Sequence, residues 1–589
     1  MHNVLMTQKI LHEEHKSAQF CVVGGGMAGF CAAVAAARNG IRTLLLQDRP
    51  VLGGNASSEV RMTVCGARGK EAKEGGILEE ALLKNLAYNP QLKYTIWDDI
   101  LYGICREEPL LEVIFNCSVN EVHHQDRRIQ SIKAWHLTRQ CWIHVEAQFF
   151  ADCSGDSILR TCGAEVRWGR ESRREFNESH APLEADDKTM GNSIMIQVKE
   201  TDEHHPFRAP SWAKKLNEKD IENRGLYPGV HNFWWLEYGG MMNTINDSDK
   251  IRDENLAIAY GAWDLIKNHP DGRAHHWELE WIGSLPGKRE NVRYVGDVII
   301  TQNDIESGGH FDDIVCHGGW PMDDHHPEAI HYKGEPTIFH PAPSPYGIPF
   351  RALYSKSMDN LFCAGRNISA THMAMSSTRV MGTTSVMGQA IGTAVAIAIE
   401  LGLTSTREIY SKVIPQLQAR LREQDQYIPW TKRPTLALTC GGVLTSDGDD
   451  PSLLMDGIER DLLNDPHGWW GKSGQSLTWT FPCPQQIKSV RIIGDSDFEN
   501  VKHQPYKYPR QAKKVNMPQF LLKTATLQAL NDNGQWSDAV QIEDNLQRLI
   551  KIPCWIQTKG LRLVIKEAWG GSSIPTHLFS FDLETSPAT

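Results

Sequence analysis

Uninterrupted apolar runs, basic runs and paired cysteines are all scarce in this chain of 589 residues. The longest apolar stretch, 386–403, is broken by Gln389 and Glu400, which predicts a buried helix rather than a membrane span. No basic stripe accompanies the formal net charge of −11, so a general nucleic-acid binder is excluded. The 13 cysteines contain no C-x-x-C pair, and their odd number is typical of reduced thiols rather than a disulfide framework.

The first residues, 1–16, alternate charged and apolar side chains and lack the apolar core of a secretion signal. Together with the reduced cysteines, this pattern predicts a cytoplasmic protein with neither membrane nor nucleic-acid partners. The length exceeds what one hydrophobic core can bury and predicts about three domains.

A strand–helix–strand unit with a glycine-rich turn organises the chain. Phe20–Val23 has the composition of a buried parallel strand, an alanine-rich helix is expected over 27–39, and a second apolar strand over 43–46. The turn from Gly24 to Gly29 has the spacing G-x-G-x-x-G. Between a strand and a helix, this spacing indicates a dinucleotide-binding site.

Each glycine of the turn has its own physical role. Gly24 permits the tight turn, Gly26 lets the backbone approach a pyrophosphate, and Gly29 lets the helix pack closely on the strand. The pyrophosphate is expected at the helix N-terminus, beside Met27 and Ala28, where the helix dipole favours negative charge.

The end of the second strand is where an acidic residue usually binds the ribose hydroxyls, about 20 residues after the glycines. Gln47 occupies the strand tip, Asp48 follows it, and Arg49 comes next. Either Gln47 or Asp48 could bind ribose, with Asp48 slightly favoured, and the alternative for Asp48 is a solvated loop acid.

Three separated stretches together resemble the FAD-dependent oxidoreductases of the two-dinucleotide-binding-domain group. They are VVGGGMAG with its trailing LGGN, FADCSGDS, and NLFCAGR followed by GTTSVMGQAIGTA. The resemblance covers most of 19–400 and implies FAD rather than NAD, because a nicotinamide enzyme would not need the chain to return so late to the nucleotide. It also implies further cofactor contacts at Gly53, Gly54, Asn55, Asp156, Gly365, Arg366, Gly388 and Gln389.

The helix that holds Gly388 and Gln389 is expected to direct its N-terminus at the flavin, where it would stabilise negative charge on the reduced ring. Simple packing of small residues is the alternative for this helix.

A more distant similarity to the flavoproteins of the fumarate reductase and succinate dehydrogenase group rests on a spacing. In both, a histidine lies seven residues after the glycine of an A-G pair, here Gly365 and His372. The arginine that follows, Arg379, lies three residues farther along than in that group. The similarity makes His372 the leading candidate for a neutral catalytic base, with a buried structural histidine as the alternative. Arg366 and Arg379 could orient substrate, and His310 is a secondary candidate for proton transfer.

These features predict an α/β fold: a Rossmann-like FAD-binding domain with an inserted α+β substrate domain and a C-terminal β-sandwich-like domain. The FAD-binding domain is expected over 18–165, including an antiparallel meander over 110–150, and again over 346–430. The substrate or cap domain is expected over 166–345. Regularly spaced short strands over 440–589 resemble a discoidin or galactose-binding sandwich.

The sequence therefore predicts an FAD-dependent dehydrogenase that oxidises a hydroxyl-bearing small molecule, a carbohydrate or glycoside, by hydride transfer to flavin N5. The 18 tryptophans favour sugar, because aromatic faces stack on sugar rings, although any single tryptophan is more often part of a core. Three alternatives stay open: a small-carboxylate reductase or dehydrogenase, redox-assisted glycoside cleavage, and a carbohydrate-binding protein with a structural flavin. No metal site is expected, since the histidines of 310–331 lack zinc-ligand spacing. The electron acceptor is unidentified, and a homo-oligomer is left open.

Overall fold

The computed structural model describes residues 11–228, 232–436, 441–462, 466–497, 504–505, 507–511 and 515–585. The chain divides into two compact units, which are considered separately. The first comprises Met1–Ala67, Lys93–Leu417 and Gln504–Ala512, and the second comprises Arg68–Leu92, Gln418–His503 and Lys513–Thr589.

A seven-stranded sheet forms the centre of the first unit. Its strands are β1 (Glu13–Val23), β2 (Thr43–Leu46), β3 (Leu111–Ile114), β4 (Cys117–Gln125), β5 (Arg128–His136), β6 (Cys141–Asp152) and β17 (Leu361–Cys363). The order is β3-β2-β1-β6-β5-β4, with β17 also paired to β6. Strands β1, β2, β3, β6 and β17 run parallel, whereas β4, β5 and β6 form the antiparallel meander expected from the sequence.

Strand β6 joins the two parts of this sheet. Its first half pairs with β5, and its last residues pair with β17, so that Leu361 lies opposite Phe150 and Cys363 opposite Asp152. The strand after residue 346 thus returns to the sheet that the first strands began, as the sequence predicted.

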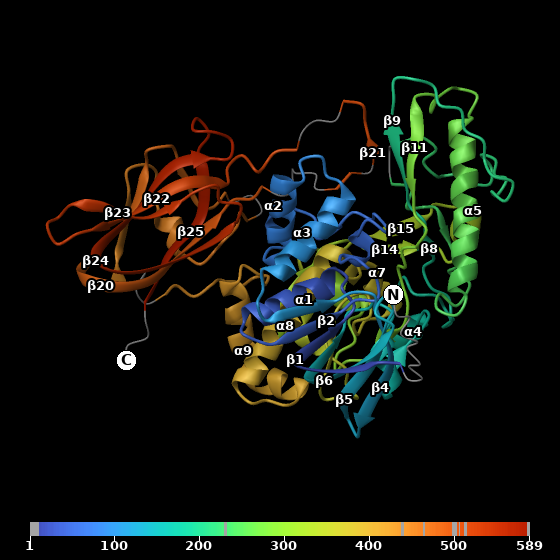
Figure 1. Ribbon diagram of the computed structural model, residues 1–589, viewed down its shortest axis with the longest axis horizontal. Coiled ribbons are helices and arrows are strands. Elements are labelled where there is room, and N and C mark those ends of the chain that lie inside the picture. The colour runs from blue at the N-terminus through green and yellow to red at the C-terminus, as the bar shows by residue number, and fades with distance from the viewer. Residues whose placement is uncertain are drawn as a thin grey trace, which may run out of the picture. The chain divides into compact units, whose positions relative to one another are not determined.

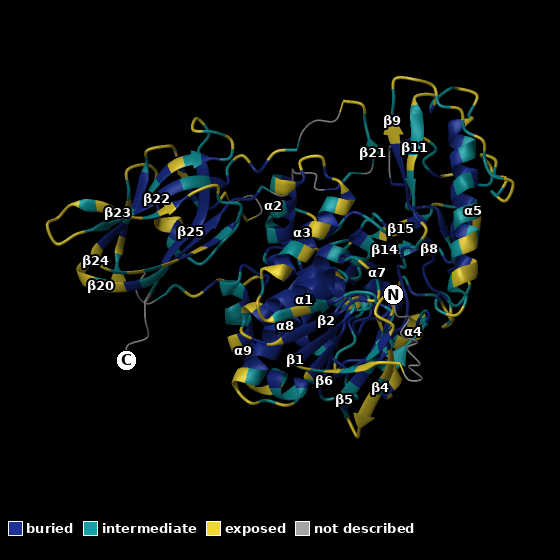
Figure 2. Ribbon diagram, viewed as in Figure 1, coloured by how far each residue is buried: buried dark blue, intermediate teal, exposed yellow. Residues whose placement is uncertain are grey.

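Two helices of small residues, α1 (Met27–Arg38) and α8 (Met381–Glu400), pack against one another beside this sheet (Figure 1). A Cβ at Gly388 would lie 2.0 Å from the carbonyl oxygen of Ala28, and one at Gly392 would lie 2.2 Å from that of Ala32. Helix α8 is long and apolar enough to cross a membrane, but 94% of its apolar window is buried inside the unit. Figure 2 shows α1 as buried along its length. Among the described helices, α8 is therefore a core helix, as expected.

The middle of the chain adds short strands and helices to the first unit. The further helices are α3 (Tyr94–Arg106), α4 (Arg173–Phe176), α5 (Ser248–Lys267), α6 (Gln302–Glu306) and α7 (His372–Thr378). The further strands are β7 (Val166–Arg167), β8 (Asn192–Ser193), β9 (Ile196–Glu200), β10 (Glu237–Tyr238), β11 (Trp277–Ile282), β12 (Arg293–Tyr294), β13 (Ile314–Gly318), β14 (Met322–His325), β15 (Thr337–His340), β16 (Tyr346–Pro349) and β21 (Lys507–Tyr508). Trp235 and Trp263 are buried in the apolar core around α5, so these tryptophans are structural.

The second unit contains α2 (Ile77–Tyr88) and an antiparallel seven-stranded sheet. Its strands are β18 (Val443–Ser446), β19 (Trp469–Gly471), β20 (Ser476–Gly494), β22 (Leu522–Leu530), β23 (Trp536–Ile542), β24 (Leu549–Ala568) and β25 (Thr576–Thr585). Register shifts between Thr480 and Gln485, and between Ile487 and Ser489, interrupt the ladder of the two long strands, β20 and β24. In its described residues, the region expected to be sandwich-like forms one continuous hydrogen-bonded sheet around one apolar core. Helix α9 (Thr406–Glu423) begins in the first unit and ends in the second.

Candidate active site

A cavity in the first unit lies where the parallel strands end. Residues within four positions after the ends of β1, β2, β6 and β17 all line it, among them Gly24, Gln47, Asp156 and Arg366. Its empty volume is about 1450 Å³, including the part open to solvent. Ligands of α/β proteins bind at the carboxyl ends of parallel strands, so the position of this cavity is that of a nucleotide site.

The glycine turn has the geometry that its spacing predicted. Gly24 has a φ of +97°, and a Cβ there would lie 2.5 Å from the backbone of Ser154. A Cβ at Gly29 would lie 1.9 Å from the carbonyl oxygen of Gly24, so close packing of α1 on β1 requires glycine there. Gly26 is the N-cap residue of α1 and supplies no side-chain cap, and Met27 and Ala28 line the cavity beside it. The free N–H groups of this turn of helix can therefore bind a phosphate.

The structure separates the roles of Gln47 and Asp48. The side-chain oxygen of Gln47 accepts a 2.7 Å hydrogen bond from the N–H of Gly25, and its amide nitrogen donates to the carbonyl of Val51. Gln47 therefore fixes the glycine turn with its side chain, while the exposed Asp48 lines the cavity and remains the candidate for binding ribose. Arg49 also lines it, and its Nη1 is buried without a hydrogen-bond partner in the described chain.

The segment Gly53–Asn55, for which the resemblance implied contacts with the cofactor, lies against the glycine turn. Gly53 donates from its N–H to the carbonyl of Gly25 at 2.9 Å, and both Gly53 and Gly54 have positive φ values, +98° and +57°. A Cβ at Gly54 would lie 3.1 Å from Cα of Gly26. Asn55 donates to the carbonyl of Lys288, and the whole segment lines the cavity.

Asp156 is held in its charged form by three donors. Lys288, Asn291 and Arg366 donate to its carboxylate at 2.7–2.8 Å. Burial opposes ionisation, but Arg366 and Lys288 keep the pKa of Asp156 well below its usual range. Nε of Arg366 remains buried without a hydrogen-bond partner in the described residues. Arg366 lines the cavity next to Gly365, so it can donate to a bound anion there.

His372 occupies a buried ion network and is not among the residues that line the cavity. Its Nδ1 lies 2.9 Å from Glu290, and its Nε2 lies 3.2 Å from Asp324. Burial alone would lower the pKa of His372. The two carboxylates outweigh this effect and raise the pKa to about 10. The imidazole is therefore charged at neutral pH and does not fit the expected neutral base.

Arg379 and Asp323 form an ion pair on the cavity wall. Nη2 of Arg379 donates to the Asp323 carboxylate at 3.1 Å, and both residues line the cavity. Nε of Arg379 is buried and has no hydrogen-bond partner in the described chain. Asp323 also accepts from Thr337, and His325 lies between Asp323 at 3.3 Å and Glu237 at 2.7 Å.

Sequence reasoning did not select Asp323 as a site residue. The only signal was its place in the cluster of aspartates and histidines between 310 and 331. Successive residues of a strand point to opposite faces, so β14 directs Asp323 and Asp324 to different partners. Sequence alone does not show which face meets the cavity.

Three predicted site residues lie elsewhere. Gly388 contacts Ala28 of α1, and neither it nor Gln389 lines the cavity, so the packing alternative holds for this part of α8. The cavity instead meets the start of that helix, at Met381 and Thr384. His310 is exposed and is likewise absent from the cavity lining.

The parallel sheet, the glycine turn and the cavity define a dinucleotide-binding protein. A model of the FAD dependent oxidoreductase family matches residues 19–421. Because this match covers more than half of the sequence, the chain belongs to the FAD dependent oxidoreductase family, and its cofactor is FAD. No curated protein matches the chain.

Solved structures show only distant likenesses. A geranylgeranyl bacteriochlorophyll reductase-like protein from Thermoplasma acidophilum is 12% identical, covers 70% of this chain and 86% of its own, and has a TM-score of 0.32. The quinol fumarate reductase FrdA of E. coli is 11% identical over 70% of this chain and 75% of its own, with a TM-score of 0.28. A family 32 carbohydrate-binding module from Streptococcus pneumoniae EndoD is 12% identical over 25% of this chain and 97% of its own, with a TM-score of 0.20.

The residues of the cavity fit FAD. The α1 N-terminus lacks a side-chain cap, and the cavity-lining residues Arg49 and Arg366 each have one buried guanidinium nitrogen without a hydrogen-bond partner among the described residues. The diphosphate of FAD needs such donors, and its ribose needs an acceptor such as Asp48. Gly26 leaves room for it, because a Cβ there would meet only Cα of Gly54, at 4.0 Å.

Proposed function

We propose that this protein is an FAD-dependent dehydrogenase that oxidises a hydroxyl group bound beside the Arg379–Asp323 ion pair. The observation that carries the proposal is a buried donor beside an acceptor on one cavity wall: Nε of Arg379, without a partner in the described chain, and the Asp323 carboxylate. A hydroxyl both donates and accepts hydrogen bonds, so it fits the two groups together. A carboxylate substrate would accept from Arg379 but be repelled by Asp323, which disfavours the small-carboxylate alternative.

The partners of Asp323 keep it an acceptor. Burial opposes its ionisation, but the nearby charges of His325 and Arg379 and the hydroxyl of Thr337 hold the pKa of Asp323 well below its usual range. At neutral pH its carboxylate is therefore ionised and can accept a hydrogen bond from the substrate hydroxyl, while Arg379 donates a hydrogen bond to the hydroxyl oxygen.

His372 contributes from behind the wall. It holds Asp324, the neighbour of Asp323 on β14, and bonds Glu290 on its other side. We infer that His372 is a positioning residue that fixes β14. When bound, FAD supplies the two-electron oxidant for the substrate C–H bond.

A carbohydrate or glycoside is the substrate class that we propose. Trp320 lines the same cavity as the Arg379–Asp323 pair. Aromatic faces stack on sugar rings, and a charged pair beside one can select a ring hydroxyl. A galactose-binding role for the C-terminal β-rich unit is part of this proposal and rests on its strand pattern.

An anaerobic titration of the holoprotein tests the proposal. Purified protein is mixed with sugars, glycosides, polyols and small hydroxy acids, and loss of the oxidised flavin absorbance is followed. We expect bleaching by a sugar or glycoside. Arg379→Lys and Asp323→Asn should each slow bleaching by about 100-fold, the effect of losing one charged hydrogen bond in a buried site.

Arg127→Ala is the matched control, because Arg127 forms an exposed ion pair with Asp359 away from the cavity lining. It should bleach at the wild-type rate. Bleaching by hydroxy acids alone would move the protein to the carboxylate class, and no bleaching by any compound would leave a structural flavin. Release of an aglycone without consumption of an electron acceptor would indicate redox-assisted glycoside cleavage.

A further inference from the structure

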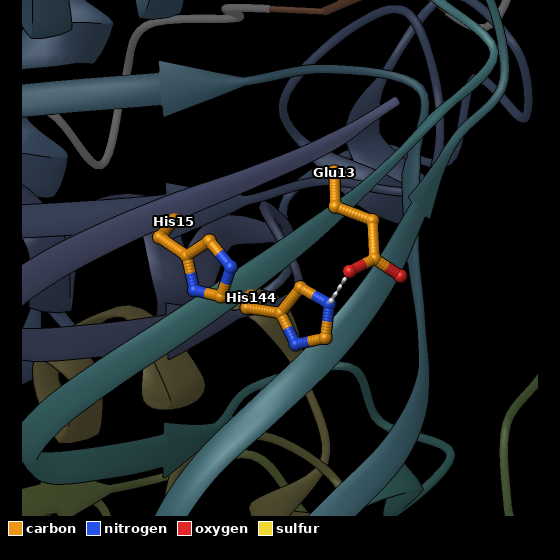
Figure 3. Close-up of side chains that lie close together, drawn as sticks. All are labelled: Glu13, His15 and His144. Carbon is orange, nitrogen blue, oxygen red and sulfur yellow. Dashed lines mark ion pairs between the residues drawn. The ribbon is translucent and has the colours of Figure 1, made fainter. Parts of the chain in front are cut away.

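Three metal-ligating side chains converge on the nucleotide sheet, at residues that are absent from the cavity lining. Glu13 and His15 come from β1, and His144 comes from β6 (Figure 3). One carboxylate oxygen of Glu13 and one ring nitrogen of each histidine all lie within 4.8 Å of one another.

The sheet register brings these side chains together. Strands β1 and β6 run parallel, and His15 lies directly opposite His144. Glu13 precedes His15 by two residues and therefore points to the same face. The two imidazole rings stack with centroids 4.8 Å apart and planes 13° apart, and Figure 3 shows the Glu13 carboxylate directed at the His144 ring.

One nitrogen in this cluster has unused binding capacity. Nε2 of His144 is buried and has no hydrogen-bond partner in the described chain. The nearest carboxylate oxygen, on Glu13, is 3.5 Å away, which is too long for a good hydrogen bond. The other oxygen of Glu13 faces Lys133 at 3.6 Å.

We propose that Glu13, His15 and His144 form a binding site for a divalent transition metal, with zinc as the ion of choice. Two imidazole nitrogens and one carboxylate are a known zinc ligand set, with a water in the fourth position. Tetrahedral bonds of about 2.0–2.2 Å place ligand atoms about 3.3 Å apart, so metal binding requires the two stacked imidazole rings to rotate and the Glu13 carboxylate to approach them. Glu13 and His15 are exposed, which gives an ion access.

The site would tie the beginning of β1 to β6. Strand β2 pairs with β1 only from Phe20 onward, whereas β6 pairs with β1 from Glu13. A bound ion would link the beginning of β1 to β6 through side chains, in addition to the backbone pairing of the two strands. The sequence did not predict the site, because its two histidines lie far apart in the chain and meet only through the register.

Equilibrium dialysis and Co²⁺ absorption test the proposal. Holoprotein stripped of metal with a chelator is dialysed at pH 7.5 against ZnCl₂, and bound zinc is counted per chain. We expect one zinc per wild-type chain, and a visible Co²⁺ spectrum in the tetrahedral range. His15→Ala and His144→Ala should each abolish this binding, and Glu13→Gln should weaken it about tenfold or more.

His124→Ala is the control, since His124 is an exposed histidine of β4 in the same sheet. Cys483 is an exposed thiol that can also take zinc, so the measured quantity is the difference between wild type and the histidine variants. Unchanged thermal unfolding of the metal-free variants shows that they fold. Equal zinc binding by wild type and His15→Ala/His144→Ala, or equal loss in His124→Ala, would overturn the proposal.

Discussion

The buried carboxyl group of Asp98, which lies next to the segment that lines the cavity, has a raised pKa. Asp98 on α3 accepts hydrogen bonds from the N–H of Ser58, which follows the cavity-lining segment Gly53–Asn55. Burial raises the pKa of Asp98 from its usual 3.8 to about 7, against the lowering effect of the Ser58 hydrogen bonds. Asp98 therefore carries a proton in the folded protein where it is ionised in the unfolded chain.

We expect this group to destabilise the fold as pH rises. Between about pH 4 and 7 the folded state binds more protons than the unfolded state, so the free energy of unfolding falls with rising pH and levels off above pH 7. The upper limit is about 1.4 kcal/mol per pH unit. Urea unfolding at pH 5.5 and 7.5 measures this pH dependence of the free energy of unfolding. Asp98→Asn should flatten the pH dependence, and the exposed neighbour Asp99→Asn should not. Equal slopes for Asp98→Asn and wild type would contradict this account.

The residue scale also shows what sequence could and could not assign. Gly24, Gly29 and Asp48 follow from the spacing of the glycine turn and of the strand after it, although the backbone that crowds Gly24 belongs to the distant Ser154. His372 was identified by spacing too, but its charge depends on Glu290 and Asp324, which approach from other parts of the chain. Spacing carries no information about such partners, so the protonation state and the Arg379–Asp323 pair needed the structure.

At the scale of elements, the contact of α1 with α8 depends on missing Cβ atoms. Gly388→Ala would place a methyl group 2.0 Å from the backbone oxygen of Ala28, so a helix must shift. We expect a loss of about 1–3 kcal/mol in unfolding free energy, measured by urea denaturation. Gly103→Ala is the control: Gly103 lies in α3 with nothing within 4 Å of the added methyl, so it should gain about 0.5–1 kcal/mol. If Gly388→Ala left the free energy of unfolding unchanged, tight packing of α8 on α1 would be refuted.

Elements with strong local patterns were predictable, and those defined by distant pairing were not. The first strands, α1 and the core helix α8 follow from apolar periodicity and small-residue content. Strand β21, at Lys507–Tyr508, pairs in parallel with β9, although more than half of the chain separates them. Likewise, the C-terminal strands were foreseen, but their joining into one sheet in the described residues depends on the registers of β20 and β24.

For the molecule as a whole, the central claim is that the cavity of the first unit binds FAD at the glycine turn. Gly26 offers a direct test because its φ of −63° suits any residue and a Cβ there meets no protein atom closer than 4.0 Å. Alanine at this position should leave the fold intact and intrude only on the space where the cofactor lies.

The decisive measurement is the FAD content of wild type and Gly26→Ala, from the absorbance spectrum of each purified protein and from reconstitution with added FAD. The account predicts one FAD per wild-type chain. It predicts at least about tenfold weaker binding in Gly26→Ala, with unchanged thermal unfolding of the flavin-free protein. A wild-type protein that neither carries FAD nor takes it up, or a Gly26→Ala variant that binds FAD as tightly as wild type, would contradict the account.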